Sequence, residues 1–223
     1  MRDLEERFKR AAHLPDRSYY KIFYGQVRPA PILTLGINPG GAPENTYPDG
    51  RTNKDGGVAS SSASYFENDE HDILDCEWRE NNGLRQLLLP LLDGKSERIR
   101  SEVVKTNLAF KRSAKVSQIK VEQAIDESAP FLAEIIAVVQ PKLVLLTGPA
   151  ISRFADRFAC ESNAVGVPER DPKVGQVVFA ASRVRLRRPA INALVIRVAH
   201  ASQFAWTYER YSVVDRIRAL IEA

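Results

Sequence analysis

Four short apolar runs punctuate the chain, at residues 32–35, 102–110, 142–148 and 193–200. Runs of this length, bounded by Gly and Pro, are typical of strands in a parallel sheet that is covered on both faces. Residues 176–181 form a fifth, weaker strand candidate. The pattern therefore predicts an α/β protein rather than a helical bundle or an all-β fold.

Stretches with helical periodicity separate these runs, at residues 2–12, 82–92, 117–139, 150–158 and 204–223. We expect Pro130 to break or kink the third of them. Strands that alternate with helices pair in parallel and place helices on both faces of the sheet. The sequence therefore predicts a three-layer α/β/α sandwich with a central, mainly parallel four-stranded sheet, folded as a single domain over residues 1–223.

Three stretches show neither the apolar runs of the predicted strands nor helical periodicity. Residues 42–70 are rich in Gly, Ser, Asn and Asp, and an irregular segment of this length in a compact domain is usually functional or disordered. Residues 161–173 read as a second irregular stretch, and residues 182–189, which carry four arginines and one proline, read as a basic loop.

Composition removes several classes of function. The net charge of +4 and pI near 9.1 permit a polyanionic partner without proving one. Two distant cysteines and three scattered histidines match no disulfide framework, zinc site or iron–sulfur spacing. No signal peptide or membrane-spanning run is visible. We therefore expect a cytoplasmic protein with no metal, no cofactor and no membrane partner.

Polar side chains follow three of the four strong strands. Asn38, Asn107 and His200 each stand where an apolar run ends. The carboxyl ends of parallel strands lie along one edge of the sheet, and ligands of open α/β sheets bind there. This coincidence predicts a site at that edge. A buried, hydrogen-bonded Asn or His that merely caps its strand is the alternative for each residue.

Around these residues the chain resembles the uracil-DNA glycosylase superfamily. Gly36-Ile-Asn-Pro-Gly40 is similar to the first motif of the mismatch-specific and single-strand-selective branches. Thr106-Asn-Leu-Ala109 resembles the strand end that reads uracil. Leu143–Ala150 is similar to the segment that runs from the third strand into a helix. His200-Ala-Ser-Gln-Phe204 resembles the second motif. The resemblance covers residues 31–223, in the family's order.

The resemblance implies a monofunctional glycosylase that flips uracil out of DNA and hydrolyses its N-glycosidic bond, which initiates base excision repair. Asn38 and His200 would be catalytic: Asn38 would hold the attacking water through its carbonyl, and a neutral His200 would donate a hydrogen bond to uracil O2. Asn107 would pair with uracil N3–H and O4, and so reject cytosine. Uracil-containing DNA, single- or double-stranded, is the expected partner, bound by a monomer.

The remaining residues surround the base or the DNA. Gly36, Ile37, Pro39 and Gly40 would line the base pocket, and Phe66 would stack on the base, with Tyr47 and Tyr65 as alternatives. Ser202 and Gln203 would contact DNA, and Phe204 would wedge into the duplex or serve as a core contact. The candidate phosphate contacts, for which a solvated charged surface is the alternative, are Lys111, Arg112, Arg185, Arg187 and Arg188.

The departures from the family pattern keep other functions open. Ala201 and Gln203 stand where prolines are common, and Asn38 replaces the acidic residue of the most active branch. One alternative is a protein of the same fold that binds uracil or abasic DNA with little turnover. Another is an unrelated nucleotide-binding enzyme, although GxGxxG and P-loop motifs are missing. Gly40 stands where a bulky residue would exclude thymine, which predicts some activity on 5-substituted uracils.

Overall fold

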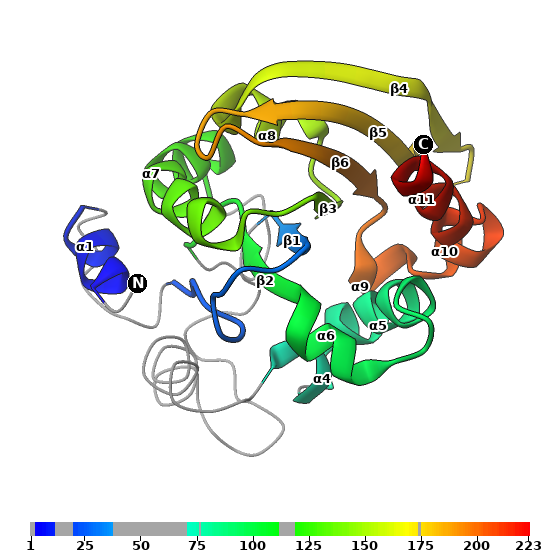
Figure 1. Ribbon diagram of the computed structural model, residues 1–223, viewed down its shortest axis with the longest axis horizontal. Helices are drawn as coiled ribbons and strands as arrows, with labels where there is room; N and C mark the ends of the chain where they lie inside the picture. The colour runs from blue at the N-terminus through cyan, green and yellow to red at the C-terminus, as the bar shows by residue number, and fades with distance from the viewer. Residues whose placement is uncertain (1–2, 12–19, 38–70, 76, 112–118, 174) are drawn as a thin grey trace.

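The computed structural model describes residues 3–11, 20–37, 71–75, 77–111, 119–173 and 175–223. Helices and strands alternate along much of this part of the chain (Figure 1). In chain order the elements are α1 (Leu4–Ala11), β1 (Ile32–Gly36), α4 (Asp72–Asp75), α5 (Arg79–Leu91), α6 (Ser96–Glu102), β2 (Val103–Asn107), α7 (Val121–Val139), β3 (Leu143–Thr147), α8 (Ile151–Phe158), β4 (Ala159–Asp171), β5 (Gln176–Leu186), β6 (Asn192–Val198), α9 (Ala201–Phe204), α10 (Trp206–Arg210) and α11 (Val213–Glu222).

The described strands form one six-stranded mixed sheet in the order β2-β1-β3-β6-β5-β4. β2, β1, β3 and β6 are parallel, which confirms the four predicted parallel strands and the α/β class. β5 and β4 continue the sheet in antiparallel pairing beyond β6. The predicted four-stranded sheet is therefore wrong in its strand number.

Two stretches that read as loops from the sequence are strands. The predicted irregular segment 161–173 falls mostly within β4, and the first part of the predicted basic loop falls within β5. In β5, buried Val184 and Leu186 alternate with exposed Arg183 and Arg185, so one face of the strand is covered and the other is wet. β4 is an edge strand whose side chains are mostly exposed, so the sequence carries no apolar signal for it.

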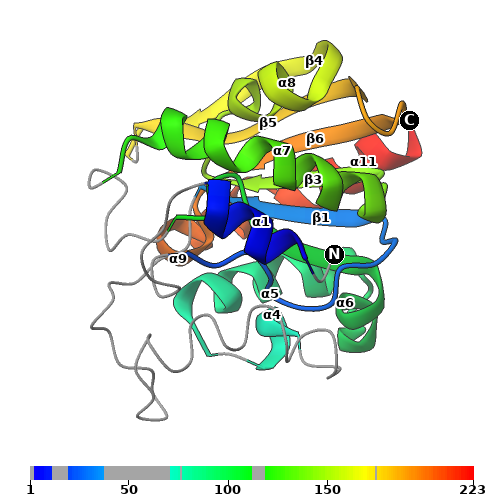
Figure 2. The ribbon, with the colours of Figure 1, turned by 90° about the vertical axis from the view of Figure 1, so that its left-hand side faces the viewer.

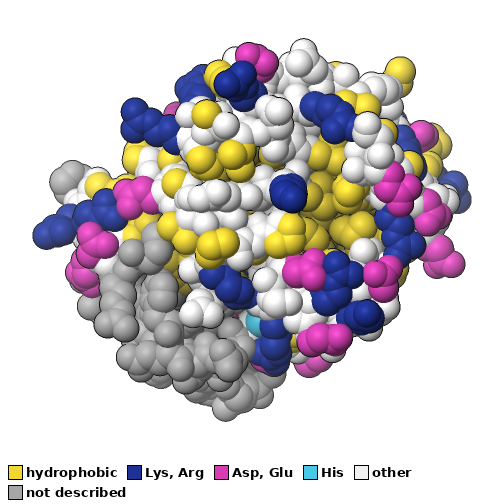
Figure 3. All heavy atoms as spheres, in the orientation of Figure 1, with side chains coloured by type: hydrophobic (Ala, Val, Ile, Leu, Met, Phe, Trp, Pro, Cys, Tyr) yellow, Lys and Arg dark blue, Asp and Glu magenta, His cyan; other side chains and the backbone are white. Residues whose placement is uncertain are grey.

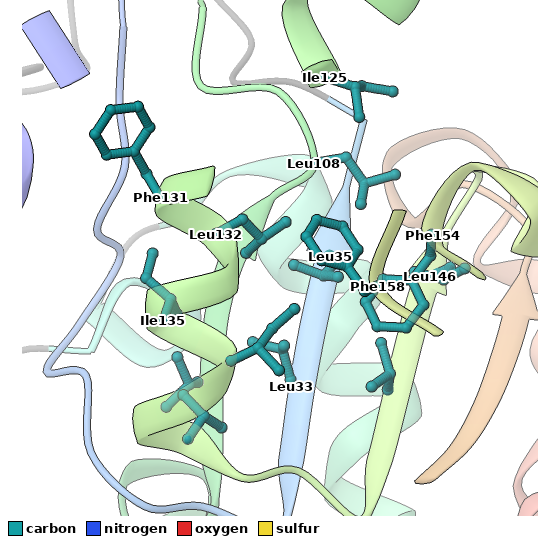
Figure 4. Packing of buried hydrophobic residues seen from close by; sticks show 14 of the residues in the cluster. Leu33, Leu35, Leu108, Ile125, Phe131, Leu132, Ile135, Leu146, Phe154 and Phe158 are labelled. Atoms are coloured by element: carbon teal, nitrogen blue, oxygen red, sulfur yellow. The ribbon is translucent and has the colours of Figure 1, made fainter. Parts of the chain in front are cut away.

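Helices cover both faces of the sheet and make three layers (Figures 1 and 2). Helices α1, α7 and α8 lie on one face, where leucines of β1 and β3 pack against aromatic and aliphatic side chains of α7 and α8 (Figure 4). Side chains of α5, α6 and α11 pack with the alternate strand positions on the other face. Because β1 and β3 are covered on both faces, all of their side chains are buried.

Helix boundaries differ from the expected ones in two places. α7 runs through Pro130 without a break, because its buried face, which includes Phe131 and Leu132, is held against the sheet on both sides of the proline. The predicted closing helix 204–223 is divided among three shorter helices, α9, α10 and α11. Ser212, between α10 and α11, has a left-handed backbone with φ of 47°, which interrupts the helix at that point. Ser117, the expected start of α7, lies outside the described residues.

None of the described helices is both long and apolar enough to cross a lipid bilayer. Within the same residues, no three His, Cys, Asp or Glu side chains gather as metal ligands would.

Candidate functional site at the carboxyl edge of the sheet

The parallel register brings three of the predicted site residues, Gly36, Asn107 and His200, to one edge. Gly36, the last residue of β1, lies beside Asn107, the last residue of β2. Thr147 at the end of β3 lies beside Val198 of β6, and His200 follows two residues later. Because β1 and β3 both lie between β2 and β6 in the sheet, the ends of these two strands separate Asn107 from the turn that carries His200.

Asn107 is held across the end of β1. Its side chain is 98% covered, and its Nδ2 donates a hydrogen bond of 2.6 Å to the Tyr24 hydroxyl oxygen. A Cβ on Gly36 would stand only 2.4 Å from Asn107 Oδ1, so this approach requires glycine. Among the described residues, no donor is bonded to Oδ1. The carbonyl of Asn107 is thus an available acceptor at the edge.

His200 has a defined tautomer. Its Nδ1 accepts the backbone N–H of Ser202 at 3.3 Å and lies 2.9 Å from the Ser202 hydroxyl. A backbone N–H can only donate, so Nδ1 carries a lone pair and the ring proton is on Nε2. The ring also lies against Gly148, where a Cβ would stand 3.2 Å from His200 Cδ2. His200 therefore offers an Nε2–H donor.

The turn that follows His200 is fixed by two contacts. A Cβ on Gly83 of α5 would stand 2.1 Å from the backbone oxygen of Ala201, so only glycine allows α5 and α9 to approach so closely. The buried hydroxyl of Tyr208 donates to the backbone oxygen of Ala199 at 2.8 Å. These contacts place His200 independently of any ligand.

A buried ionic cluster lies next to Asn107 and was missed in the sequence. Lys21 and Lys105 bind the two carboxylate oxygens of Asp72, at 3.4 and 3.1 Å. Lys105 also donates to Asn81 Oδ1 at 2.6 Å, and both ammonium groups lie over the Tyr24 ring. All four of these polar residues are buried. A lysine within the apolar β2 run was the signal that could have revealed the cluster, because a buried lysine needs a partner.

Glu80 is a further residue at the site that sequence reasoning missed. Its Oε1 lies 3.4 Å from the position that a Cβ on Gly36 would take, and its Oε2 lies 3.9 Å from Lys105 Nζ. Its side chain is 25% exposed. A carboxylate from the first turn of α5 therefore reaches the end of β1, beside Asn107.

Several predicted site residues lie outside the described part of the chain. These are Asn38, Pro39, Gly40, Phe66 and Arg112, together with the alternatives Tyr47 and Tyr65. Ile37 is described, and its backbone oxygen accepts from the N–H of Ala109 at 2.8 Å. The roles expected of the other residues remain predictions.

The residues after His200 are only partly placed as the resemblance implies. Ser202 is bonded to His200, and Gln203 is exposed. Phe204 is partly buried and packs against the core on the α5 side of the sheet, which fits the alternative of a core contact. Trp206, two residues further on, is 47% exposed.

Those predicted phosphate contacts that the structure describes do not lie together. Lys111 forms an ion pair with Glu127 at 2.5 Å. Arg185 pairs across the sheet with Asn192 at the amino end of β6, roughly 25 Å from His200 at ~3.3 Å per strand residue. Arg187 donates to the backbone oxygen of Ala159 at 2.9 Å, beyond the end of α8. Arg185 and Arg187 thus lie toward the opposite edge of the sheet, with Arg188 next in the chain.

A hollow of about 950 Å³ also lies toward that opposite edge, lined by residues that include Ile32, Leu143 and Asn192. Figure 3 shows apolar side chains on this face of the molecule, with Lys, Arg, Asp and Glu around them. The hollow is lined by none of the predicted site residues except Arg185. It is therefore separate from the site formed by Asn107 and His200.

The comparisons with known proteins leave the family open. No family model matches the chain, and no curated protein matches it. The functional argument therefore depends on the geometry of the site and on the motif resemblance.

The contact between α5 and α9 generates a stability prediction. Gly→Ala inside a helix normally stabilises it by about 0.5–1 kcal/mol, but at Gly83 the added methyl would collide with the Ala201 backbone. We expect Gly83→Ala to lower the free energy of unfolding by ~1–3 kcal/mol and to shift the imidazole NMR signals of His200. The control is Gln86→Ala, at an exposed position of the same helix. Equal stability and unchanged His200 signals in Gly83→Ala would contradict the described packing.

The burial of His71 predicts how the stability of the protein depends on pH. Burial lowers the pKa of His71 from its usual value, and the charges of Arg28 and Lys105 lower it further, whereas its bond to the Val103 oxygen and the charge of Asp72 oppose this. Below pH ~6.5 His71 is therefore protonated in the unfolded chain but not in the folded chain. The free energy of unfolding consequently falls as the pH falls.

The expected contribution of His71 is up to ~1.4 kcal/mol per pH unit in that range. Denaturant unfolding of wild type and His71→Gln between pH 7 and pH 5 measures it, because glutamine can donate to the Val103 oxygen but does not titrate there. The variant should lose less stability than wild type over this range. Parallel curves for the two proteins would show that His71 is not the group responsible.

Proposed function

We propose that the protein is a uracil-DNA glycosylase that hydrolyses the bond between uracil and deoxyribose in DNA. The observation that carries the proposal is that Asn107 and His200 both lie at the carboxyl edge of the sheet, with the ends of β1 and β3 between them. One supplies an available carbonyl and amide, and the other supplies an N–H donor. The four motifs that resemble the glycosylase superfamily support the same function.

Recognition of the base would rest on Asn107. Its Oδ1 accepts the uracil N3–H, and the Nδ2 hydrogen that Tyr24 does not use donates to O4. Tyr24 holds the amide in that orientation. Cytosine presents the inverted pattern, so it would leave buried polar atoms without partners. A mismatch of this kind discriminates by orders of magnitude.

Departure of the base would depend on His200. Negative charge develops on the uracil oxygens as the glycosidic bond breaks, and a fixed N–H donor aimed at O2 stabilises that charge. The bonds from Ser202 to Nδ1 keep the proton on Nε2 before the substrate arrives. Little reorganisation is then needed during the reaction.

Hydrolysis would use a positioned water rather than an early strong base. The Asn38 carbonyl orients the water, which suits a transition state in which the sugar already carries positive charge. Glu80 brings a carboxylate to the same edge, and its negative charge favours that developing cation. The ammonium group of Lys105 lies 3.9 Å from Glu80 Oε2 and attracts this carboxylate.

Single- or double-stranded uracil-containing DNA is the proposed partner of the monomer, and 5-substituted uracils remain proposed substrates because of Gly40.

A flipped base leaves a gap in the stack. Trp206 is more exposed than Phe204 and lies on the helix after the His200 turn, so it is the more available side chain to fill that gap.

The test measures base release from a uracil-containing oligonucleotide under single-turnover conditions, detected by alkaline cleavage of the abasic product. We expect Asn38→Ala and His200→Ala each to lower the rate by at least ~100-fold, because each removes a contact made in the transition state. Their circular dichroism spectra should match wild type.

The matched control is Arg185→Gln, which changes a charge toward the opposite edge of the sheet and should leave the rate unchanged. If wild type binds the DNA tightly but releases no base, the protein is instead a uracil- or abasic-DNA-binding protein of this fold. Wild-type rates in both alanine variants would exclude the assigned site.

A further inference from the structure

Arg197 stands on β6 three residues before His200. Alternate residues Ala193 and Val195 pack into the core beneath α7 and α8, so Arg197 projects from the same face of the sheet. It lies opposite Leu146 of β3 and Ala180 of β5. The side chain is therefore near the carboxyl edge of the sheet, on the face opposite α5.

No acceptor among the described residues is bonded to the guanidinium of Arg197. Its Nε is buried without a hydrogen-bond partner, and no carboxylate in the described part of the chain forms an ion pair with it. The rest of the side chain is half-buried. A buried donor without an acceptor costs roughly 1–3 kcal/mol, and more when the group is charged. Arg197 is therefore an unfavourable residue for the isolated protein.

Two other arginines lie near Arg197 and make its position less favourable still. Burial lowers the pKa of Arg197, and the charges of Arg170 on β4 and Arg153 in the first turn of α8 lower it further. An arginine nevertheless keeps its proton in proteins. Arg197 is thus partly desolvated beside two further arginines, of which Arg153 is paired with Glu122.

The neighbouring carboxylates are engaged elsewhere. Glu122 is bound to Arg153 and Arg157 at 2.8 and 3.0 Å. Asp171 accepts from the Tyr211 hydroxyl at 2.7 Å, and Glu169 pairs with Arg216 at 3.7 Å. The positive charge of Arg197 is therefore not balanced by a direct contact from these elements.

An anion with several oxygens would satisfy this arrangement. The planar guanidinium fork matches the oxygens of a phosphate, and charge-assisted bonds of this type are among the stronger ones in proteins. A phosphodiester bound at the accessible part of the guanidinium would balance the charge of Arg197 and reduce its repulsion from Arg170. The position near the carboxyl edge fits a DNA strand whose target base enters the site beside His200.

We propose that Arg197, assisted by the nearby positive charge of Arg170, binds a backbone phosphate of the DNA strand that carries the target base. This inference rests on the proposed function for the identity of the strand. It places a phosphate contact at the carboxyl edge of the sheet, whereas Arg185 lies toward the amino edge.

The experiment measures binding of a fluorescent single-stranded oligonucleotide without uracil at several salt concentrations. We expect Arg197→Gln to weaken binding about tenfold at low salt, as the loss of a charge-assisted bond would. It should also reduce the slope of log affinity against log salt by ~0.7, the value for one phosphate contact on single strands. Arg185→Gln, the matched control on β5, should leave both unchanged.

Thermal unfolding separates a binding role from a structural one. Because Arg197 has no protein acceptor among the described residues, Arg197→Gln should be at least as stable as wild type without DNA. Arg197→Lys keeps the charge but loses the fork, so it should recover the salt slope more than the affinity. A lower melting temperature in both variants would mean that Arg197 is structural and would overturn the proposal.

The remaining outcomes are also decisive. A wild-type salt slope in Arg197→Gln, or an equal loss in Arg185→Gln, overturns the proposal. Stabilisation by inorganic phosphate that requires Arg197, without any effect of Arg197 on DNA binding, assigns the site to a free anion and also overturns it. Because the probe lacks uracil, a failure to release uracil would count against the proposed function alone.

Discussion

The site depends most on the buried ion pairs of the Asp72 carboxylate. This carboxylate binds two lysines, Lys21 from the segment before β1 and Lys105 from β2, and thereby fixes α4 against the sheet. Removing one partner of a buried ion pair leaves an uncompensated charge and typically costs about 3–5 kcal/mol. The lysines also hold the ring of Tyr24, whose hydroxyl sets the orientation of Asn107.

Helix α5 links this cluster to the other half of the site. Within its first turns, Glu80 reaches Gly36, Asn81 binds Lys105 and the backbone of Asp72, and Gly83 contacts Ala201. One rigid helix thus sets the distance between the Asn107 side and the His200 side. Such a preorganised arrangement suits a reaction in which charge develops on both the leaving base and the sugar, because fixed dipoles need not reorganise.

The parallel part of the sheet could be predicted from the sequence, because its physical causes are local. The parallel strands are continuous apolar runs, and the polar residues at their ends stood out by position; the structure brings Asn107 and His200 to one edge as expected. The mostly exposed edge strand β4 carries no such signal. The positions of Arg185 and Arg187 depended on strand β5, which runs antiparallel to its neighbour and carries them away from the site. Contacts such as Glu80 with Gly36 join distant segments, and no local pattern encodes them.

The proposed uracil excision at this edge is tested most directly by comparing uracil and cytosine at the same position of one oligonucleotide, with the protein in excess and the free base identified by mass. The geometry of Asn107 and His200 predicts release of free uracil, an alkali-labile strand and no release of cytosine. Release of neither base from DNA that the protein demonstrably binds, or equal release of both, would contradict the account.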